Sequence, residues 1–134
     1  MTLRGRCLCQ AVRYEVDEPF DAFVYCHCSR CRHATGTAHA ANAVVPPGAF
    51  RWISGEDKVA RYNLPTARGF ATAFCTTCGS PMPHLTKSGR RVIVPAGSLI
   101  DEPSMKPTIH AHWASRAGWF EIDPDLPRVD EDAF

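Results

Sequence analysis

Hydrophobic and polar residues alternate over short segments of this chain, and no helical period persists beyond one or two turns. The clearest alternation covers residues 6–16, where the apolar face carries Leu8, Val12, Tyr14 and Val16. Cys7 and Cys9 fall on the other face of that segment. Because successive side chains of a strand point to opposite faces, this pattern predicts one strand that presents both thiols side by side.

Similar short patterns predict strands along the rest of the chain. The predicted segments are residues 41–45, 50–54, 59–63, 69–74, 91–95 and 119–122, and a further strand in which Val24, Cys26 and Cys28 share one face. Most of the 11 prolines and nine glycines fall between these segments, where they favour turns. Helical turns are expected only at residues 29–34 and 103–106. We therefore expect an all-β fold with little helix.

Length and composition indicate a single domain. The chain has 134 residues, of which 45% are hydrophobic, so residues 1–134 are expected to share one core, with a poorly ordered Asp/Pro-rich tail at 124–134. The formal net charge is only +1 and the basic residues are scattered, which does not favour a nucleic-acid partner. No apolar segment is long enough for a signal peptide or a membrane span, so we expect a cytoplasmic protein.

Seven cysteines are the most informative residues of the chain. They form three groups, Cys7-Leu8-Cys9, Cys26-His27-Cys28-Ser29-Arg30-Cys31 and Cys75-Thr76-Thr77-Cys78. In a reducing compartment this spacing is more typical of metal binding than of disulfides. Thiolates one or two residues apart favour zinc, which takes sulfur at about 2.3 Å in tetrahedral geometry. Seven thiolates and two Zn²⁺ ions would add a net −3, which lowers the charge of +1 to about −2.

The first and last cysteine groups predict a closed structural site. Cys75 and Cys78, followed by Gly79, are expected to form a tight turn that aims two sulfurs at one ion. That ion needs two more ligands, and Cys7 and Cys9 offer them from far back in the chain. Such a zinc site would tie the first strand to the middle of the chain and contribute directly to folding.

The middle group, Cys26, Cys28 and Cys31, has no eighth cysteine to complete it. Its fourth ligand is therefore a histidine, a carboxylate, water or a group from outside the chain. Among the histidines, His27 is expected on the opposite face, which leaves His33, His39, His84, His110 and His112. A closed three-cysteine, one-histidine site would be structural, whereas an open site would act as a Lewis acid and bind an incoming thiol.

The ordered cysteine groups also carry a resemblance. Gly5-Arg6-Cys7-Leu8-Cys9, Cys26-His27-Cys28-Ser29-Arg30-Cys31-Arg32 and Phe74-Cys75-Thr76-Thr77-Cys78-Gly79-Ser80-Pro81 are similar to motifs of the glutathione-dependent formaldehyde-activating enzyme family. Pro95-Ala96-Gly97-Ser98-Leu99 and Ala117-Gly118-Trp119-Phe120-Glu121-Ile122 fit its C-terminal half. One departure is Gln10, where the family commonly has glycine; we expect it to alter a local bend and leave the ligands intact.

The resemblance implies a β-tent of mostly antiparallel sheets with two zinc ions per chain. One ion would be structural, on Cys7, Cys9, Cys75 and Cys78, and the other catalytic, on Cys26, Cys28 and Cys31. The implied reaction joins glutathione and formaldehyde to give S-(hydroxymethyl)glutathione, which is classed as a carbon-sulfur lyase reaction in reverse and serves detoxification.

A glutathione substrate would need partners for its two carboxylates. Arg30 and Arg32 flank Cys31 and are the nearest arginines in sequence, and Arg32 is favoured over Arg30 for this role. Ser98 with Gly97 could offer loop donors. His27, His33 and His39 are the candidates for delivering a proton to the new hydroxyl. The tryptophans and nearby phenylalanines, Trp52, Trp113, Trp119, Phe70 and Phe74, are expected in the core.

Two other function classes remain open from the sequence. The first is a non-enzymatic zinc module that binds a protein or nucleic-acid partner, which a closed second site would favour. The second is a related lyase that acts on another thiol conjugate, since function depends on the walls of the site rather than on the fold.

Overall fold

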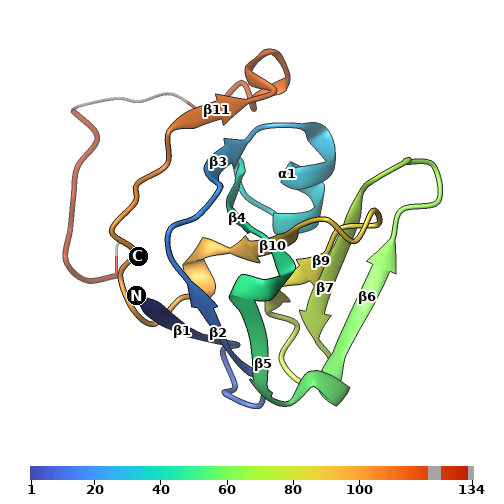
Figure 1. Ribbon diagram of the computed structural model, residues 1–134. Coiled ribbons are helices and arrows are strands. Elements are labelled where there is room, and N and C mark those ends of the chain that lie inside the picture. The colour runs from blue at the N-terminus through green and yellow to red at the C-terminus, as the bar shows by residue number, and fades with distance from the viewer. Residues whose placement is uncertain (121–124, 133–134) are drawn as a thin grey trace.

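The computed structural model describes residues 1–120 and 125–132. Its strands are β1 (Thr2–Arg6), β2 (Arg13–Asp17), β3 (Ala22–Cys26), β4 (Ala40–Val45), β5 (Phe50–Ser54), β6 (Val59–Asn63), β7 (Ala71–Cys75), β8 (Pro81–Met82), β9 (His84–Leu85), β10 (Val92–Pro95) and β11 (Ile109–Ala111). The α-helix is α1 (Ser29–Thr35), and the 3-10 turns are η1 (Pro47–Ala49), η2 (Glu56–Lys58), η3 (Ala96–Ser98) and η4 (Trp113–Ser115). Figure 1 shows α1 close to β3 and β4, with β6 and β7 to one side.

The strands form three sheets. Their orders are β1-β2-β5, β11-β3-β4-β10-β9 and β6-β7-β8. Every strand pair is antiparallel except β11 with β3, which is parallel. The expectation of an all-β fold with mostly antiparallel sheets and little helix is therefore confirmed. Among the described residues, no helix combines the length and the hydropathy needed to span a bilayer.

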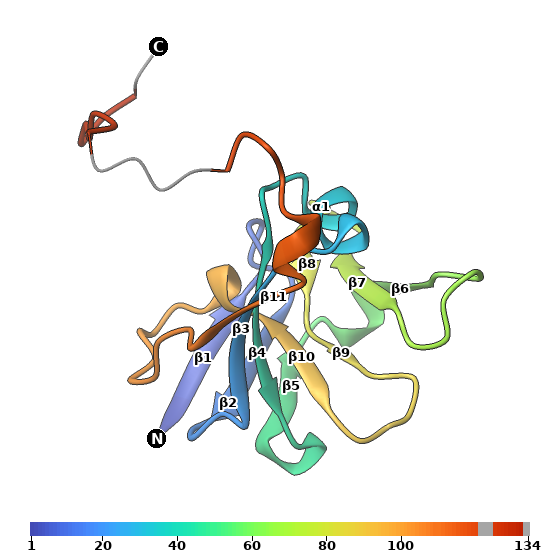
Figure 2. The ribbon, with the colours of Figure 1, turned by 90° about the horizontal axis from the view of Figure 1, so that it is seen from above.

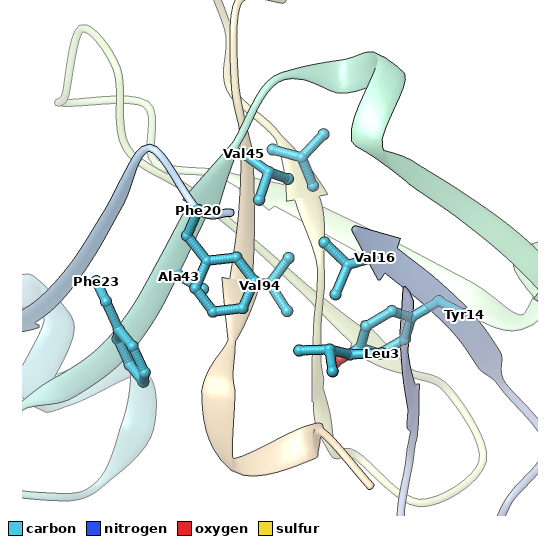
Figure 3. Packing of buried hydrophobic residues seen from close by; sticks show 9 residues of the cluster. Leu3, Tyr14, Val16, Phe20, Phe23, Ala43, Val45 and Val94 are labelled. Atoms are coloured by element: carbon cyan, nitrogen blue, oxygen red, sulfur yellow. The ribbon is translucent and has the colours of Figure 1, made fainter. Parts of the chain in front are cut away.

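The main core lies between the first sheet and the central sheet (Figure 3). Its buried side chains are Leu3, Tyr14, Val16, Phe20, Phe23, Ala43, Val45, Val92 and Val94. Tyr14 lies across Gly5, where a Cβ atom would come within 2.1 Å of the tyrosine ring. Only glycine fits at this position of β1, so the packing of Tyr14 explains why a glycine precedes the first cysteine pair.

The predicted strand over residues 6–16 is wrong, because this segment is a hairpin. β1 ends at Arg6 and β2 begins at Arg13. Between them the N–H of Cys7 donates to the carbonyl of Val12 at 3.1 Å, which closes the turn. Gln10 adopts a left-handed backbone conformation there, with φ of 69°. Gln10 therefore occupies this turn at the cost of local strain, and an altered bend relative to the family stays a prediction.

Other expected elements differ in detail. The strands at 50–54 and 59–63 are confirmed, and those at 41–45, 69–74 and 91–95 differ at their ends by one or two residues. Residues 103–106 form no helix, because the N–H and hydroxyl of Ser104 bond instead to Glu18 Oε1 at 2.7 and 2.9 Å. Residues 119–120 are not in a strand, and 121–122 lie outside the described residues, as do 124 and 133–134 of the expected tail.

Candidate functional site

Cys7, Cys9, Cys75 and Cys78 converge to form what we call the four-cysteine cluster. Their sulfurs all lie within 4.8 Å of one another. Cys9 Sγ lies 3.6 Å from Cys7 Sγ and 3.9 Å from Cys75 Sγ. Four sulfurs around a tetrahedral zinc, each at about 2.3 Å, are separated by about 3.8 Å. The spacing of these sulfurs therefore fits a zinc ion.

Two turns build the four-cysteine cluster, one from each of two sheets. Cys7 and Cys9 lie in the β1–β2 turn, and the N–H of Val12 donates to Cys7 Sγ at 3.3 Å. Cys75 ends β7, and the N–H of Gly79, which has φ of 78°, returns to the Cys75 carbonyl at 2.7 Å. The expected knuckle at Cys75 and Cys78 thus has the predicted turn. For Cys7 and Cys9, a hairpin turn rather than strand pleating aims the sulfurs.

Ser80 connects these two turns, a role that the sequence analysis missed. Its Oγ accepts a hydrogen bond from the N–H of Leu8 at 3.0 Å and lies 3.2 Å from Cys78 Sγ. Hydrogen bonding from Ser80 lowers the pKa of Cys78 to about 5. The serine therefore favours the thiolate form that a metal needs. Its position two residues after the last cysteine was the available signal.

Cys26, Cys28 and Cys31 form the three-cysteine cluster, whose sulfurs also lie within 4.8 Å of one another. Cys26 ends β3, and Cys28 is the N-cap residue of α1. Cys31 lies buried in the first turn of the helix, and its N–H donates to Cys28 Sγ at 3.3 Å. The predicted strand shared by Cys26 and Cys28 ends before Cys28, because the chain turns there into the helix.

The environment of the three-cysteine cluster sorts the thiols by their pKa values. Burial raises the pKa of Cys31 and of Cys26 above the usual range. The pKa of Cys28 is lowered despite burial, because backbone and side-chain hydrogen bonds from Cys31 favour its thiolate. Three adjacent thiols do not ionise together without a cation between them, whereas a bound divalent ion allows it. The donor set is thus suited to a thiophilic metal.

No histidine or carboxylate completes the three-cysteine cluster within residues 1–120 and 125–132. None of the predicted closures, His33, His39, His84, His110 or His112, joins the sulfurs. His27 is not part of the cluster, as expected. It is fully buried, and its Nε2 lies 2.8 Å from His110 Nδ1. The closed three-cysteine, one-histidine alternative is therefore not formed by the described residues.

A group of aromatic rings surrounds His27. The ring centroids of His39, His110, Trp113 and Phe120 lie within 5.1 Å of that of His27. Two of the three predicted proton donors, His27 and His39, thus belong to this aromatic group. Among the described residues, neither of these rings hydrogen-bonds to a cysteine, and neither does His33, which is exposed on α1.

The two predicted substrate-binding residues have different environments. Arg32 Nε is buried without a hydrogen-bond partner among the described residues. Ser98 donates to the carbonyl of Pro95 at 2.7 Å and accepts from the Tyr14 hydroxyl at 2.6 Å. The Ser98 hydroxyl is therefore engaged within the fold, and a contact with substrate stays a prediction for both residues.

The aromatic residues expected in the core are only partly there. Trp52 packs against the core, whereas Trp113 and Trp119 are 43% and 71% exposed. Phe74 is also exposed, at 38%, because strand β7 turns that side chain toward solvent. Aromatic residues in this chain thus also line surfaces.

Comparison with known proteins supports one family. A family model described as glutathione-dependent formaldehyde-activating enzyme matches residues 2–115. A protein of Halomonas elongata, provisionally named as an enzyme of that description, is 27% identical over 133 residues, which cover 92% of this chain and 82% of that protein. The crystal structure of a Rhodobacter sphaeroides protein is similar with a TM-score of 0.64 and 25% identity, over 81% of this chain and 99% of that one.

Proposed function

The chain belongs to the glutathione-dependent formaldehyde-activating enzyme family, and from this premise we propose that it joins glutathione and formaldehyde reversibly to give S-(hydroxymethyl)glutathione. In reverse this is a carbon-sulfur lyase reaction that would serve formaldehyde detoxification. One observation carries the proposal. Three sulfurs converge at Cys26, Cys28 and Cys31 with no fourth donor from the described residues, which leaves a position for an incoming thiol.

Two zinc ions would be held by the two clusters. Cys7, Cys9, Cys75 and Cys78 would hold one that stabilises the fold, and Cys26, Cys28 and Cys31 would hold a catalytic one. When bound there, zinc supplies Lewis acidity and favours the thiolate form of a coordinated thiol. Residues 1–134 would thus form a single zinc-binding domain. Seven unpaired thiols suit a reducing compartment, so we place the protein in the cytoplasm.

The local structure around the three-cysteine cluster positions the sulfurs that would hold the catalytic ion. The N–H of Cys31 holds Cys28 Sγ at the start of α1, and β3 fixes Cys26 beside it. As the substrate sulfur bonds to the aldehyde carbon, the carbon-oxygen double bond becomes single, and the proton lost by the thiol ends on the new hydroxyl. Cys26 and Cys28 are half-buried, so water that reaches them can carry this proton. Proximity of the two reactants then supplies the main acceleration.

Cobalt substitution tests the proposal directly. Cobalt-loaded protein should show a thiolate-to-metal absorption band that grows when glutathione is added, because the substrate sulfur occupies the fourth position. The Cys26→Ser variant, whose three-cysteine cluster is incomplete, should show no growth. An unchanged spectrum in the unaltered protein would overturn the glutathione proposal, and growth with another thiol alone would indicate a lyase for a different conjugate.

A further inference from the structure

A groove is lined by residues of α1 and of the segments that include β6 and β7. Figure 2 shows the ribbons of α1, β6 and β7 on the same side of the molecule. The volume of the groove is about 370 Å³, within the range of small-molecule sites. Its lining residues are Ser29, Arg30, His33, Ala34, Tyr62, Leu64, Phe70 and Thr72. Two segments far apart in the sequence thus form this groove, and neither the cysteine clusters nor the core uses it.

The helix side of the groove is basic. Arg30 and His33 both lie on α1 and line the groove, and neither forms an ion pair with a described residue. None of the residues that line the groove is acidic. An unpaired guanidinium beside a cavity is suited to bind a carboxylate through two parallel hydrogen bonds.

The sheet side of the groove combines apolar and hydroxyl groups. Leu64 and Phe70 provide apolar surface, whereas Thr72 and Tyr62 add hydroxyl groups. Tyr62 and Thr72 are directly paired across β6 and β7. A wall of this composition fits a peptide, which has short apolar stems and several amide groups.

One lining residue connects the groove to the three-cysteine cluster along the chain. Ser29, which lines the groove, directly follows Cys28 in the chain. The helix rises about 1.5 Å per residue, so Ser29 and His33 lie about 6 Å apart along α1. Because each helical residue is rotated by about 100°, Cys31 faces away from the groove while Arg30 and His33 face into it. A ligand with its sulfur at Cys28 can therefore extend around the start of the helix into the groove.

We propose that this groove binds the carboxylate-bearing peptide part of the thiol substrate, with Arg30 as the residue that selects for a carboxylate. The inference rests on the proposed function for the identity of the ligand, which is glutathione. It differs from the sequence-based expectation, in which Arg32 was favoured over Arg30. Arg32 is not among the lining residues and its Nε is buried, whereas Arg30 lines the groove.

The first test measures binding of S-methylglutathione by calorimetry to the zinc-loaded protein. Its sulfur is methylated, so it reports on the groove and not on thiolate coordination. Arg30→Gln should weaken binding about 10-fold or more, since a charge-assisted hydrogen bond is lost. Ala34→Trp should weaken it too, by filling the groove. The matched control Arg90→Gln removes an exposed arginine outside the groove and should bind like the unaltered protein.

The inference is overturned if the unaltered protein does not bind S-methylglutathione, or if Arg30→Gln and Ala34→Trp both bind it like Arg90→Gln. Circular dichroism and zinc content of each variant verify that the fold is intact. A parallel measurement keeps the two proposals apart. Addition of 2-mercaptoethanol, which lacks carboxylates, should change the cobalt spectrum equally in all four proteins. If neither this thiol nor glutathione changes the cobalt spectrum, the proposed function fails. The calorimetry still tests whether the groove binds the peptide part of the ligand.

Discussion

The two cysteine clusters are similar in chemistry and opposite in construction. The four-cysteine cluster joins two turns that are separated by at least 66 positions in sequence, the separation of Cys9 and Cys75. The three-cysteine cluster comes from one short segment, where β3 ends and α1 begins. Closing a long loop restricts the unfolded chain more than closing a short one, by about 0.6 kcal/mol for each doubling of loop length. The first construction is therefore suited to stabilise the fold, and the second to leave a position for a ligand.

Substitution of Cys75 should break this comparison most strongly. Cys75→Ser removes a fully buried ligand of the four-cysteine cluster. We expect a loss of about 4 kcal/mol or more in the free energy of unfolding, because loss of a structural metal belongs to the largest class of effects. Thermal unfolding should show Tm lowered by about 15 °C or more. A Tm within a few degrees of the unaltered protein would contradict a structural role.

The matching substitution in the three-cysteine cluster should reduce activity strongly and stability only a little. Cys28→Ser should reduce the rate of S-(hydroxymethyl)glutathione formation by about 10³-fold or more, because Lewis-acid stabilisation is worth several kcal/mol. Its Tm should fall much less than that of Cys75→Ser, since α1 is short and lies at the surface. Formaldehyde consumption and thermal unfolding, measured on the same preparations, check this pair. Equal loss of stability in both variants would refute the division of roles.

A smaller effect is expected for substitution of Ser98. This substitution tests whether Ser98 stabilises the fold or binds substrate. Ser98→Ala leaves the buried Tyr14 hydroxyl without its partner, which should cost about 1–2 kcal/mol of stability. The KM for glutathione should stay unchanged, because the serine hydroxyl bonds within the fold. Urea unfolding and steady-state kinetics provide the two measurements. A raised KM at unchanged stability would instead support the sequence-based expectation that Ser98 binds substrate.

The smallest effect concerns the turn that carries Cys7 and Cys9. Gln10→Gly should raise the free energy of unfolding by about 0.5–1 kcal/mol, because glycine adopts the left-handed conformation at Gln10 without strain. Loss of the hydrogen bond from Arg13 to Gln10 Oε1, at 2.7 Å, reduces this gain only slightly because it is exposed. Urea unfolding measures the difference. Destabilisation would show that the bond outweighs the strain.

The sequence predicted which cysteines gather in each cluster better than it predicted the geometry of the clusters. Spacing within a group is local, so a closely spaced pair such as Cys75 and Cys78 can be recognised from the sequence alone. Apolar alternation continues through residues 7–12, however, so a strand and a hairpin turn look alike there. Strands β8, β9 and β11 contain only two or three residues, too few to show a period. The groove depends on how the fold places β6 and β7 relative to α1, which no local pattern encodes.

Stepwise metal removal tests the division between the two clusters most directly. The zinc-loaded protein is treated with a chromogenic chelator while released zinc, circular dichroism and enzyme activity are followed in one sample. The account predicts that one zinc ion per chain leaves first, that activity falls in step with it, and that the second ion leaves only as the protein unfolds. Release of both ions together with the fold, or activity that survives loss of the first ion, would contradict it.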